Sequence, residues 1–173
     1  MQKTRRKAAT RIVLKASIVF LATYVGLMTI VFFWGAEAIE LPVNRWTARS
    51  SAWALRLLGA GATARGDLVD SSVASIRIIS ECTALYPAVI YVAAVVATPL
   101  PWRRKLWAAL GLAVLAFVNL LRIVSLCYIL KWYPGAADAA HYVVWQSLMI
   151  FVTVLLWILW AGRPGSAHDA APA

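Results

Sequence analysis

The chain has 173 residues, of which 62% are hydrophobic and only 14% are charged. Soluble domains carry about a quarter charged residues, so this composition excludes an ordinary soluble protein and indicates an integral membrane protein. The formal net charge of +10 calls for no nucleic-acid partner. A basic arm beside a membrane helix is attracted to anionic lipid, which makes membrane lipids the expected partner of these charges.

Four apolar stretches are long enough to cross a membrane, which takes roughly 20 residues of helix. They predict an all-α integral membrane protein with about four transmembrane helices and one long outer loop, forming a single membrane domain over 1–173. The first stretch exceeds the apolar core of a signal peptide, which has about 7–15 residues, so we expect it to be retained. The expected parts are a basic arm (1–15), TM1 (16–34), the outer loop (35–82), TM2 (83–100), TM3 (106–130), TM4 (142–160) and a tail (161–173).

The Lys and Arg residues predict the orientation of these helices. Ten of the seventeen basic residues lie close to helix ends on one side of the expected membrane. The positive-inside rule assigns that side to the cytoplasm, so both termini are expected there. These ten residues are Lys3, Arg5, Arg6, Lys7, Arg11, Lys15, Arg103, Arg104, Lys105 and Arg163.

The long outer loop has internal order of its own. Between Arg45 and Gly59, aromatic and aliphatic residues share one helical face and three arginines share an adjacent one, which is typical of a helix lying in the membrane interface. The segment Val73–Ile79 is rich in β-branched residues and predicts a short extended stretch. The residues on the two helical faces are Trp46, Trp53 and Leu57, and Arg45, Arg49 and Arg56.

Three residues of different predicted spans lie at or near the same outer end. Cys82 precedes TM2, His141 precedes TM4, and Arg122 lies about 12 Å of helical rise below the outer end of TM3. A charged residue inside a span is costly, so a functional role is the default expectation for Arg122. Asn119 and Ser125 share its helical face and should point toward other helices or a wet cavity.

Each candidate also has a simpler interpretation. Arg122 could pair with backbone carbonyls or a headgroup, and His141 could be an interfacial polar residue, although Asp138 stands three residues before it and could orient its ring. Cys82 could form a disulfide with Cys127, which an oxidising compartment would permit. Two cysteines and two histidines on different sides, His168 in the tail being one of them, give no metal-ligand spacing, and we expect no metal or cofactor.

The region Glu81–Trp160 resembles the exosortase/archaeosortase family of membrane cysteine transpeptidases. The resemblance rests on ECTALYP opening one helix, NLLRIVSL inside the next and AHYVVWQ opening the last. It implies that Cys82, Arg122 in its N-x-x-R-I context, and His141 are the catalytic residues. The chain departs from many members in having Thr83-Ala84 where they carry a Ser/Gly pair and in having fewer helices, which makes it similar to the short exosortase H type.

The resemblance implies a thiol protease and transpeptidase of a prokaryotic inner membrane, with its site toward the periplasm or cell exterior. Its substrates would be secreted proteins ending in a short motif, a transmembrane helix and a basic cluster. These would be cleaved through a thioacyl intermediate and transferred to an envelope or lipid acceptor. Two alternatives remain, a non-catalytic scaffold in which Arg122 pairs with a helix or lipid, and a small anion transporter using Asn119 and Arg122. The sequence leaves the recognition motif, the acceptor and the oligomeric state open.

Overall fold

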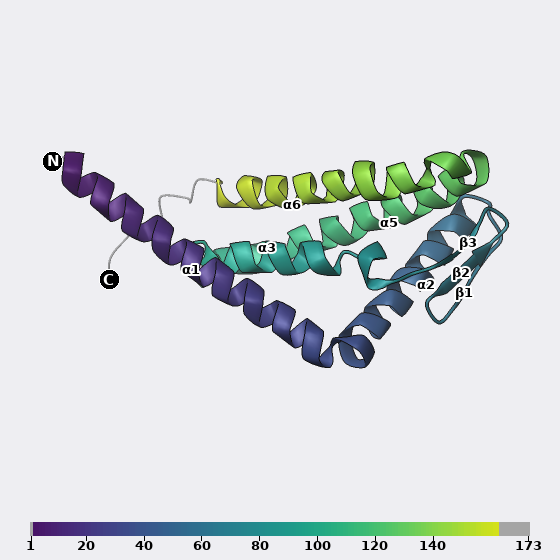
Figure 1. Cartoon of the computed structure of the whole chain (residues 1–173), viewed down its shortest axis with the longest axis horizontal. Helices are drawn as coiled ribbons and strands as arrows, with labels where there is room; N and C mark the ends of the chain where they lie inside the picture. Colours follow the sequence, from purple (N-terminus) through teal and green to yellow (C-terminus); the bar gives the residue numbers. More distant parts are fainter. Residues whose placement is uncertain (1, 163–173) are drawn as a thin grey trace.

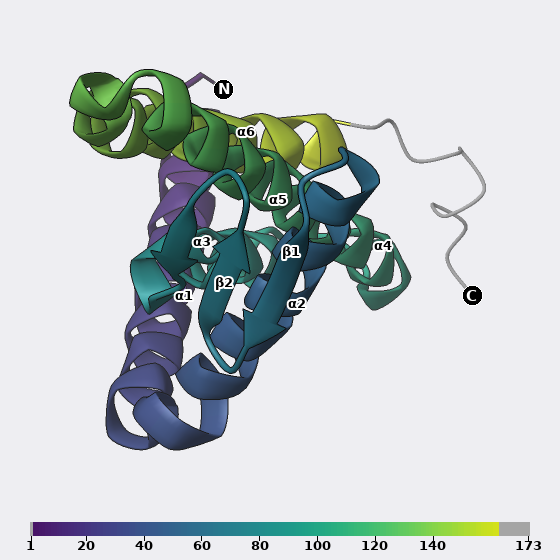
Figure 2. The same ribbon diagram turned by 90° about the vertical axis from the view of Figure 1, so that its right-hand side faces the viewer.

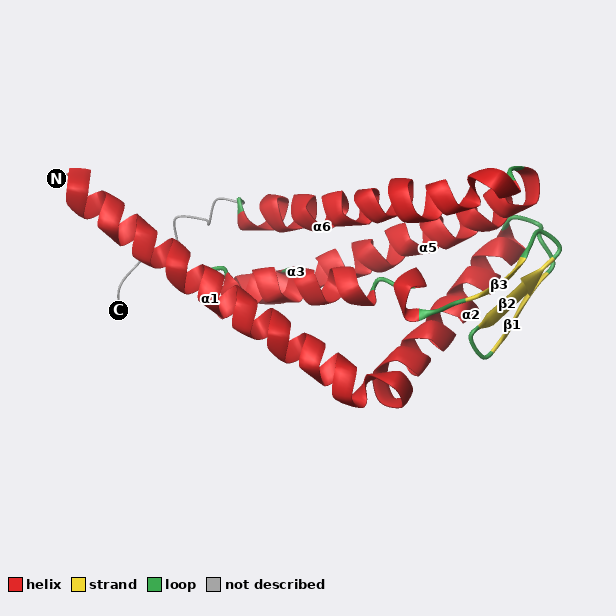
Figure 3. Cartoon of the chain, in the orientation of Figure 1, coloured by secondary structure: helices red, strands yellow, loops and turns green. Residues whose placement is uncertain are grey.

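The computed structural model describes residues 2–162, with side chains described from Thr10 onward except those of Trp34 and Ala36. Within this range the protein is mostly helical, and three of its helices run side by side along the long axis of the molecule (Figures 1 and 3). These are α3 (Leu85–Ala97), α5 (Ala109–Trp132) and α6 (Gln146–Ala161). The expected tail, with Arg163 and His168, lies beyond residue 162 and outside this description.

Three helical stretches of the described chain are long and apolar enough to cross a membrane. They cover Thr10–Phe33, Trp102–Trp132 and Ala139–Ala161, with 24, 31 and 23 residues. The helix within the expected TM2 is shorter, because α3 has only 13 residues. At 1.5 Å per residue it is about 20 Å long, less than the roughly 30 Å of a hydrocarbon core. The molecule therefore combines three membrane-length helices with a short fourth one.

The first long helix, α1 (Gln2–Gly35), packs mainly against α3 and diverges from the other long helices (Figure 1). A π-helical turn at Ala36–Glu40 then redirects the chain into α2 (Leu41–Leu57), whose first turn contains Pro42. The chain thus bends sharply between the two helices (Figure 1). This bend carries α2 back across α5.

The amphipathic helix predicted between Arg45 and Gly59 is present as part of α2. One face is buried, and the opposite face exposes all six predicted residues, Arg45, Trp46, Arg49, Trp53, Arg56 and Leu57. The helix ends in a Schellman motif: Gly59 adopts φ +80°, its N–H bonds the Arg56 carbonyl at 3.0 Å, and the Ala60 N–H bonds the Leu55 carbonyl at 3.0 Å. Glycine favours this left-handed conformation because it has no Cβ.

A three-stranded antiparallel sheet follows α2, which the all-α expectation did not include. Its strands are β1 (Ala62–Arg65), β2 (Leu68–Ser71) and β3 (Ser75–Arg77), in the order β1-β2-β3. Gly66 at φ +65° lies in the two-residue turn between β1 and β2. Only β3 falls within the extended segment predicted from β-branched residues. The sheet covers one end of the molecule, in front of α2 and α5 (Figure 2).

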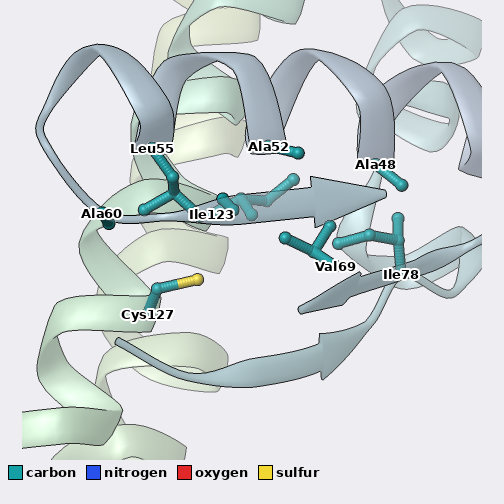
Figure 4. Packing of buried hydrophobic residues seen from close by; sticks show 9 residues of the cluster. Ala48, Ala52, Leu55, Ala60, Val69, Ile78, Ile123 and Cys127 are labelled. Atoms are coloured by element: carbon teal, nitrogen blue, oxygen red, sulfur yellow. The ribbon is translucent and has the colours of Figure 1, made fainter. Parts of the chain in front are cut away.

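A compact apolar cluster joins α2, the sheet and α5 (Figure 4). Leu55 of α2, Val69 of β2, and Ile78 just after β3 are each at most 1% exposed. Ile123 and Cys127 contribute the α5 side of the same cluster. Because Ile78 is anchored here, the chain that leaves β3 passes close to the middle of α5.

The opposite end of α5 is fixed by a close approach between two helices. A Cβ on Gly111 would collide with the ring of Tyr91, which is 2% exposed. The Tyr91 hydroxyl donates a 3.0 Å hydrogen bond to the Ala108 carbonyl, at the break between α4 (Trp102–Trp107) and α5. The Trp157 indole N–H donates to the Thr98 hydroxyl at 3.0 Å, which ties α6 to the end of α3. These contacts set how α3, α5 and α6 pack together.

Candidate active site

Cys82 lies in a 3-10 turn, Ser80–Cys82, between β3 and α3. The Cys82 N–H donates to the Ile79 carbonyl at 2.9 Å. The next residue, Thr83, is 1% exposed, and its hydroxyl donates to the Ser80 carbonyl at 2.7 Å and accepts from the Leu85 N–H at 3.3 Å. Local hydrogen bonds therefore hold the backbone on both sides of the cysteine, while its side chain stays partly exposed.

Asn119 of α5 fixes the cysteine from the neighbouring helix. Its side-chain amide Nδ2 donates a 3.0 Å hydrogen bond to the Cys82 carbonyl oxygen. Asn119 is only 2% exposed, so this bond lies in a protected environment. The sequence predicted that Asn119 faces the interior, and the structure adds its partner.

Arg122 lies one helical turn beyond Asn119 and is also 2% exposed. Its Nε has no hydrogen-bond partner, and among the described residues no carboxylate lies within 4.0 Å of its guanidinium. The Arg122 charge does interact electrostatically with Cys82. A buried cation without a counter-ion is costly in a membrane protein, so it favours a site that holds negative charge during its working cycle.

His141 approaches the cysteine from the third element. It lies in a π-helical segment, Ala139–Trp145, that leads directly into α6. The widened turn of a π-helix is frequent at functional sites. The His141 Nε2 lies 4.0 Å from the Cys82 Sγ, at the long limit of a thiol–imidazole hydrogen bond. His141 also interacts electrostatically with Arg122, so the three predicted residues form one cluster.

Two residues expected to support the site contribute little to its geometry. Asp138 is exposed, and its carboxylate does not lie within 4.0 Å of the His141 ring, on which it acts only at longer range. The Ser125 hydroxyl donates to the Arg122 carbonyl at 2.8 Å, a bond within its own helix. The spacing of residues along a helix predicted which side chains share a face, but it did not predict the hydrogen-bond partners of their polar atoms.

Thr83 was missed as a site residue by the sequence reasoning. In the sequence, Thr83 was notable only because Thr83-Ala84 replaces the Ser/Gly pair that follows the cysteine in many family members. A signal was present, because a hydroxyl residue two positions before a helix commonly accepts a backbone N–H there. The buried Thr83 hydroxyl does so in this chain, and it thereby orients the turn that presents Cys82.

Cys127, the alternative partner of Cys82, is not bonded to it. Both cysteines are free thiols, so the structure contains no Cys82–Cys127 disulfide. Cys127 is fully buried in the apolar cluster of α2, the sheet and α5. Cys127 occupies the position of a packing residue, while the partly buried Cys82 packs against the edge of that cluster and has its Sγ 4.0 Å from His141 Nε2.

The comparisons with known proteins identify the family of the chain. Residues 10–161 match the family model described as transmembrane exosortase (Exosortase_EpsH). The match extends well beyond the C-terminal half in which the motifs lie and includes the first long helix. No curated protein and no solved structure matched the chain. A match over most of the sequence shows that this multi-pass membrane protein belongs to the transmembrane exosortase family.

Proposed function

We propose that the protein is a membrane cysteine protease and transpeptidase that cleaves C-terminal sorting signals of secreted proteins and transfers them to an envelope or lipid acceptor. The observation that carries the proposal is the convergence of Cys82, Arg122 and His141 from three separate elements. A thiol 4.0 Å from an imidazole supplies the nucleophile and base that acyl transfer by a cysteine uses, and the buried Arg122, whose Nε has no hydrogen-bond partner, supplies a cation.

The first half-reaction forms a thioacyl enzyme. His141 Nε2 accepts the proton of the Cys82 thiol, and the resulting Sγ thiolate attacks the scissile carbonyl carbon. When the tetrahedral intermediate collapses, the C–N bond breaks and the departing amine takes the proton from His141. The thiol–imidazole distance of 4.0 Å shortens when substrate enters, as catalytic hydrogen bonds often do.

Arg122 supports the charged species of both steps. Its guanidinium stabilises the thiolate before attack and the oxyanion that develops on the carbonyl oxygen afterwards. Such stabilisation is strongest where water is excluded and the donor is already in place. The 2% exposure of Arg122 and the free Nε–H meet both conditions.

The second half-reaction releases the product. The acceptor nucleophile loses a proton to His141 and attacks the thioester carbon. The C–S bond then breaks, and the departing Cys82 thiolate takes that proton from His141 to regenerate the thiol. An amine or hydroxyl acceptor gives transpeptidation or esterification, and water gives simple hydrolysis. Asn119 keeps the Cys82 backbone in place through both half-reactions.

The proposed orientation places both termini in the cytoplasm of a prokaryotic inner membrane and the site toward the exterior. The basic residues near the helix ends support it, since α4 carries Arg103, Arg104 and Lys105 at the end of the molecule opposite the sheet. A substrate that remains anchored by its own C-terminal helix after secretion would meet the site from that side.

The test co-expresses the protein with a secreted reporter that ends in a short motif, a transmembrane helix and a basic cluster. Wild type should shorten the reporter, and Cys82→Ala, Arg122→Ala and His141→Ala should leave it full length at equal protein levels. Neutral hydroxylamine should release the reporter from a covalent complex with the wild-type protein, because it cleaves thioesters. Cys127→Ala serves as the matched control, and it should process normally.

Processing by Cys82→Ala at the wild-type rate would remove the thioacyl mechanism. If a cellular function of the protein survived Cys82→Ala but not Arg122→Ala, a scaffold in which Arg122 pairs with a helix or lipid would replace the enzyme.

A further inference from the structure

A groove opens beside the backbone of Cys82, on the side of α5 that faces α2. Its volume is about 570 Å³, and it is bounded by α2, α3 and α5. The lining is mostly apolar, and it also includes the hydroxyl residues Thr47 and Ser50 and the amide of Asn119.

Among the polar lining residues, Asn119 has a buried atom without a hydrogen-bond partner, whereas the Ser50 hydroxyl bonds carbonyls of its own helix. Asn119 is 2% exposed and uses its Nδ2 on the Cys82 carbonyl, but its Oδ1 has no hydrogen-bond partner. A buried amide oxygen without a donor is costly in an apolar setting, so it favours an occupant that brings an N–H. The hydrocarbon chain of a lipid has none to offer.

The small residues of the wall favour a helix as that occupant. Ala84, directly before α3, and Ala88 of α3 are four residues apart and both line the groove, as do Thr47 and Ser50 of α2 and Ala116 of α5. Such small residues let two helix backbones approach closely in a membrane. A helix also has free N–H groups, but only in its first turn.

We infer that this groove holds the transmembrane helix of the substrate's sorting signal, with the free N–H groups of its first turn directed at Asn119 Oδ1. The inference rests on the proposed function. In such a signal the motif to be cleaved precedes the helix, so the first turn lies next to the scissile bond. Asn119 would then hold the cysteine with one side-chain atom and the substrate helix with the other.

The length of α3 determines how many residues a substrate helix needs to run from Cys82 to the opposite end of α3. Cys82 stands three residues before α3, which has 13 residues and is about 20 Å long at 1.5 Å per residue. A substrate helix alongside it needs about 13 residues to run from the site to the opposite end. The basic α4 follows α3 and marks the inner face in the proposed orientation, so a scissile bond about 20 Å from that end lies below the outer limit of a hydrocarbon core roughly 30 Å thick.

Photo-crosslinking tests the groove without requiring catalysis. A benzophenone amino acid replaces Phe117, which lines the groove, or Phe151 of α6, which does not, each in the Cys82→Ala background. The two phenylalanines are 59% and 62% exposed, so they form a matched pair. Irradiation in membranes that contain the uncleaved reporter should join it to position 117 and not to position 151.

A second measurement fills the groove. Ala116→Leu adds bulk to its wall, and Ala113→Leu adds the same bulk to an exposed position of α5 outside it. We expect Ala116→Leu to lower the reporter processing rate at least about tenfold, since inserted bulk excludes a packed helix. Ala113→Leu should process normally, and maleimide should label Cys82 at the same rate in both variants.

The inference would be overturned if the reporter were captured at position 151, equally at both positions, or at neither. It would also be overturned if position 117 captured only lipid or only a second copy of this chain. Normal processing by Ala116→Leu would overturn it as well. Capture at position 117 together with normal processing by Cys82→Ala would leave the groove intact and reject only the proposed chemistry.

Discussion

The amide of Asn119 and the carbonyl of Cys82 are joined by a 3.0 Å hydrogen bond that spans 37 residues of sequence. The bond ties the turn before α3 to the middle of α5, one helical turn from Arg122. The cysteine and the arginine therefore keep their relative position even though they belong to different elements.

Loss of this bond should impair positioning more than folding. Asn119→Leu is expected to lower processing about 10- to 100-fold, because a small displacement of a reacting group has effects of that size. The rate at which maleimide labels Cys82 should also change in this variant. A role of Asn119 in stability alone, away from the site, would leave that rate unchanged. Ser125→Ala is the control, since its hydroxyl bonds only its own helix, and it should retain activity and labelling. An unaltered rate in Asn119→Leu would contradict the positioning role.

Replacement of Arg122 should separate stability from activity. Arg122→Met keeps an unbranched side chain of similar length but removes a buried charge that has no carboxylate within 4.0 Å among the described residues. We expect the free energy of unfolding to rise by about 1–4 kcal/mol while processing is lost. Thermal unfolding in detergent and the reporter assay measure the two effects. A variant that is both inactive and less stable would indicate that the guanidinium holds the fold together.

The two cysteines should differ in accessibility. Cys82 is partly exposed, and Cys127 is fully buried in the apolar cluster. Maleimide should label one thiol in the folded protein and two after denaturation, as read by intact mass. Cys127→Ala should lose about 1 kcal/mol of stability and keep the folded-state label, whereas Cys82→Ala should lose that label. If the unreduced protein took up no maleimide after denaturation, Cys82 and Cys127 would instead be joined by a disulfide.

The contact between Gly111 and Tyr91 should be sensitive to a single methyl group. Gly111→Ala places a Cβ against the Tyr91 ring, and overpacking of this kind costs about 1–3 kcal/mol. Gly26→Ala is the matched control, because its added Cβ meets nothing within 4 Å and it too lies in a membrane helix. Melting temperatures in detergent should fall for the first variant only. Equal values for the two would mean that the helices can shift apart without loss.

The local sequence predicted those elements that depend on composition and periodicity. Long apolar stretches gave the membrane helices, and the spacing of Trp46, Trp53 and Leu57 gave the exposed face of α2, because helix geometry alone decides which side chains share a face. The β1–β2 hairpin was missed. Its strands are four residues each, too short for a clear alternation, and only Gly66 marked the turn.

The candidate site shows the same division. The sequence by itself nominated Cys82, Arg122 and His141, because a charge inside a span and a family-like motif are both local signals. Only the tertiary structure decided that they meet, since this depends on the rotation of α5, the bend before α2 and the anchoring of Ile78 against α5. It also decided that Asn119 bonds the cysteine backbone while Ser125 bonds its own helix. Helical spacing fixes the face on which a side chain lies, but the neighbouring elements that pack there supply its partner.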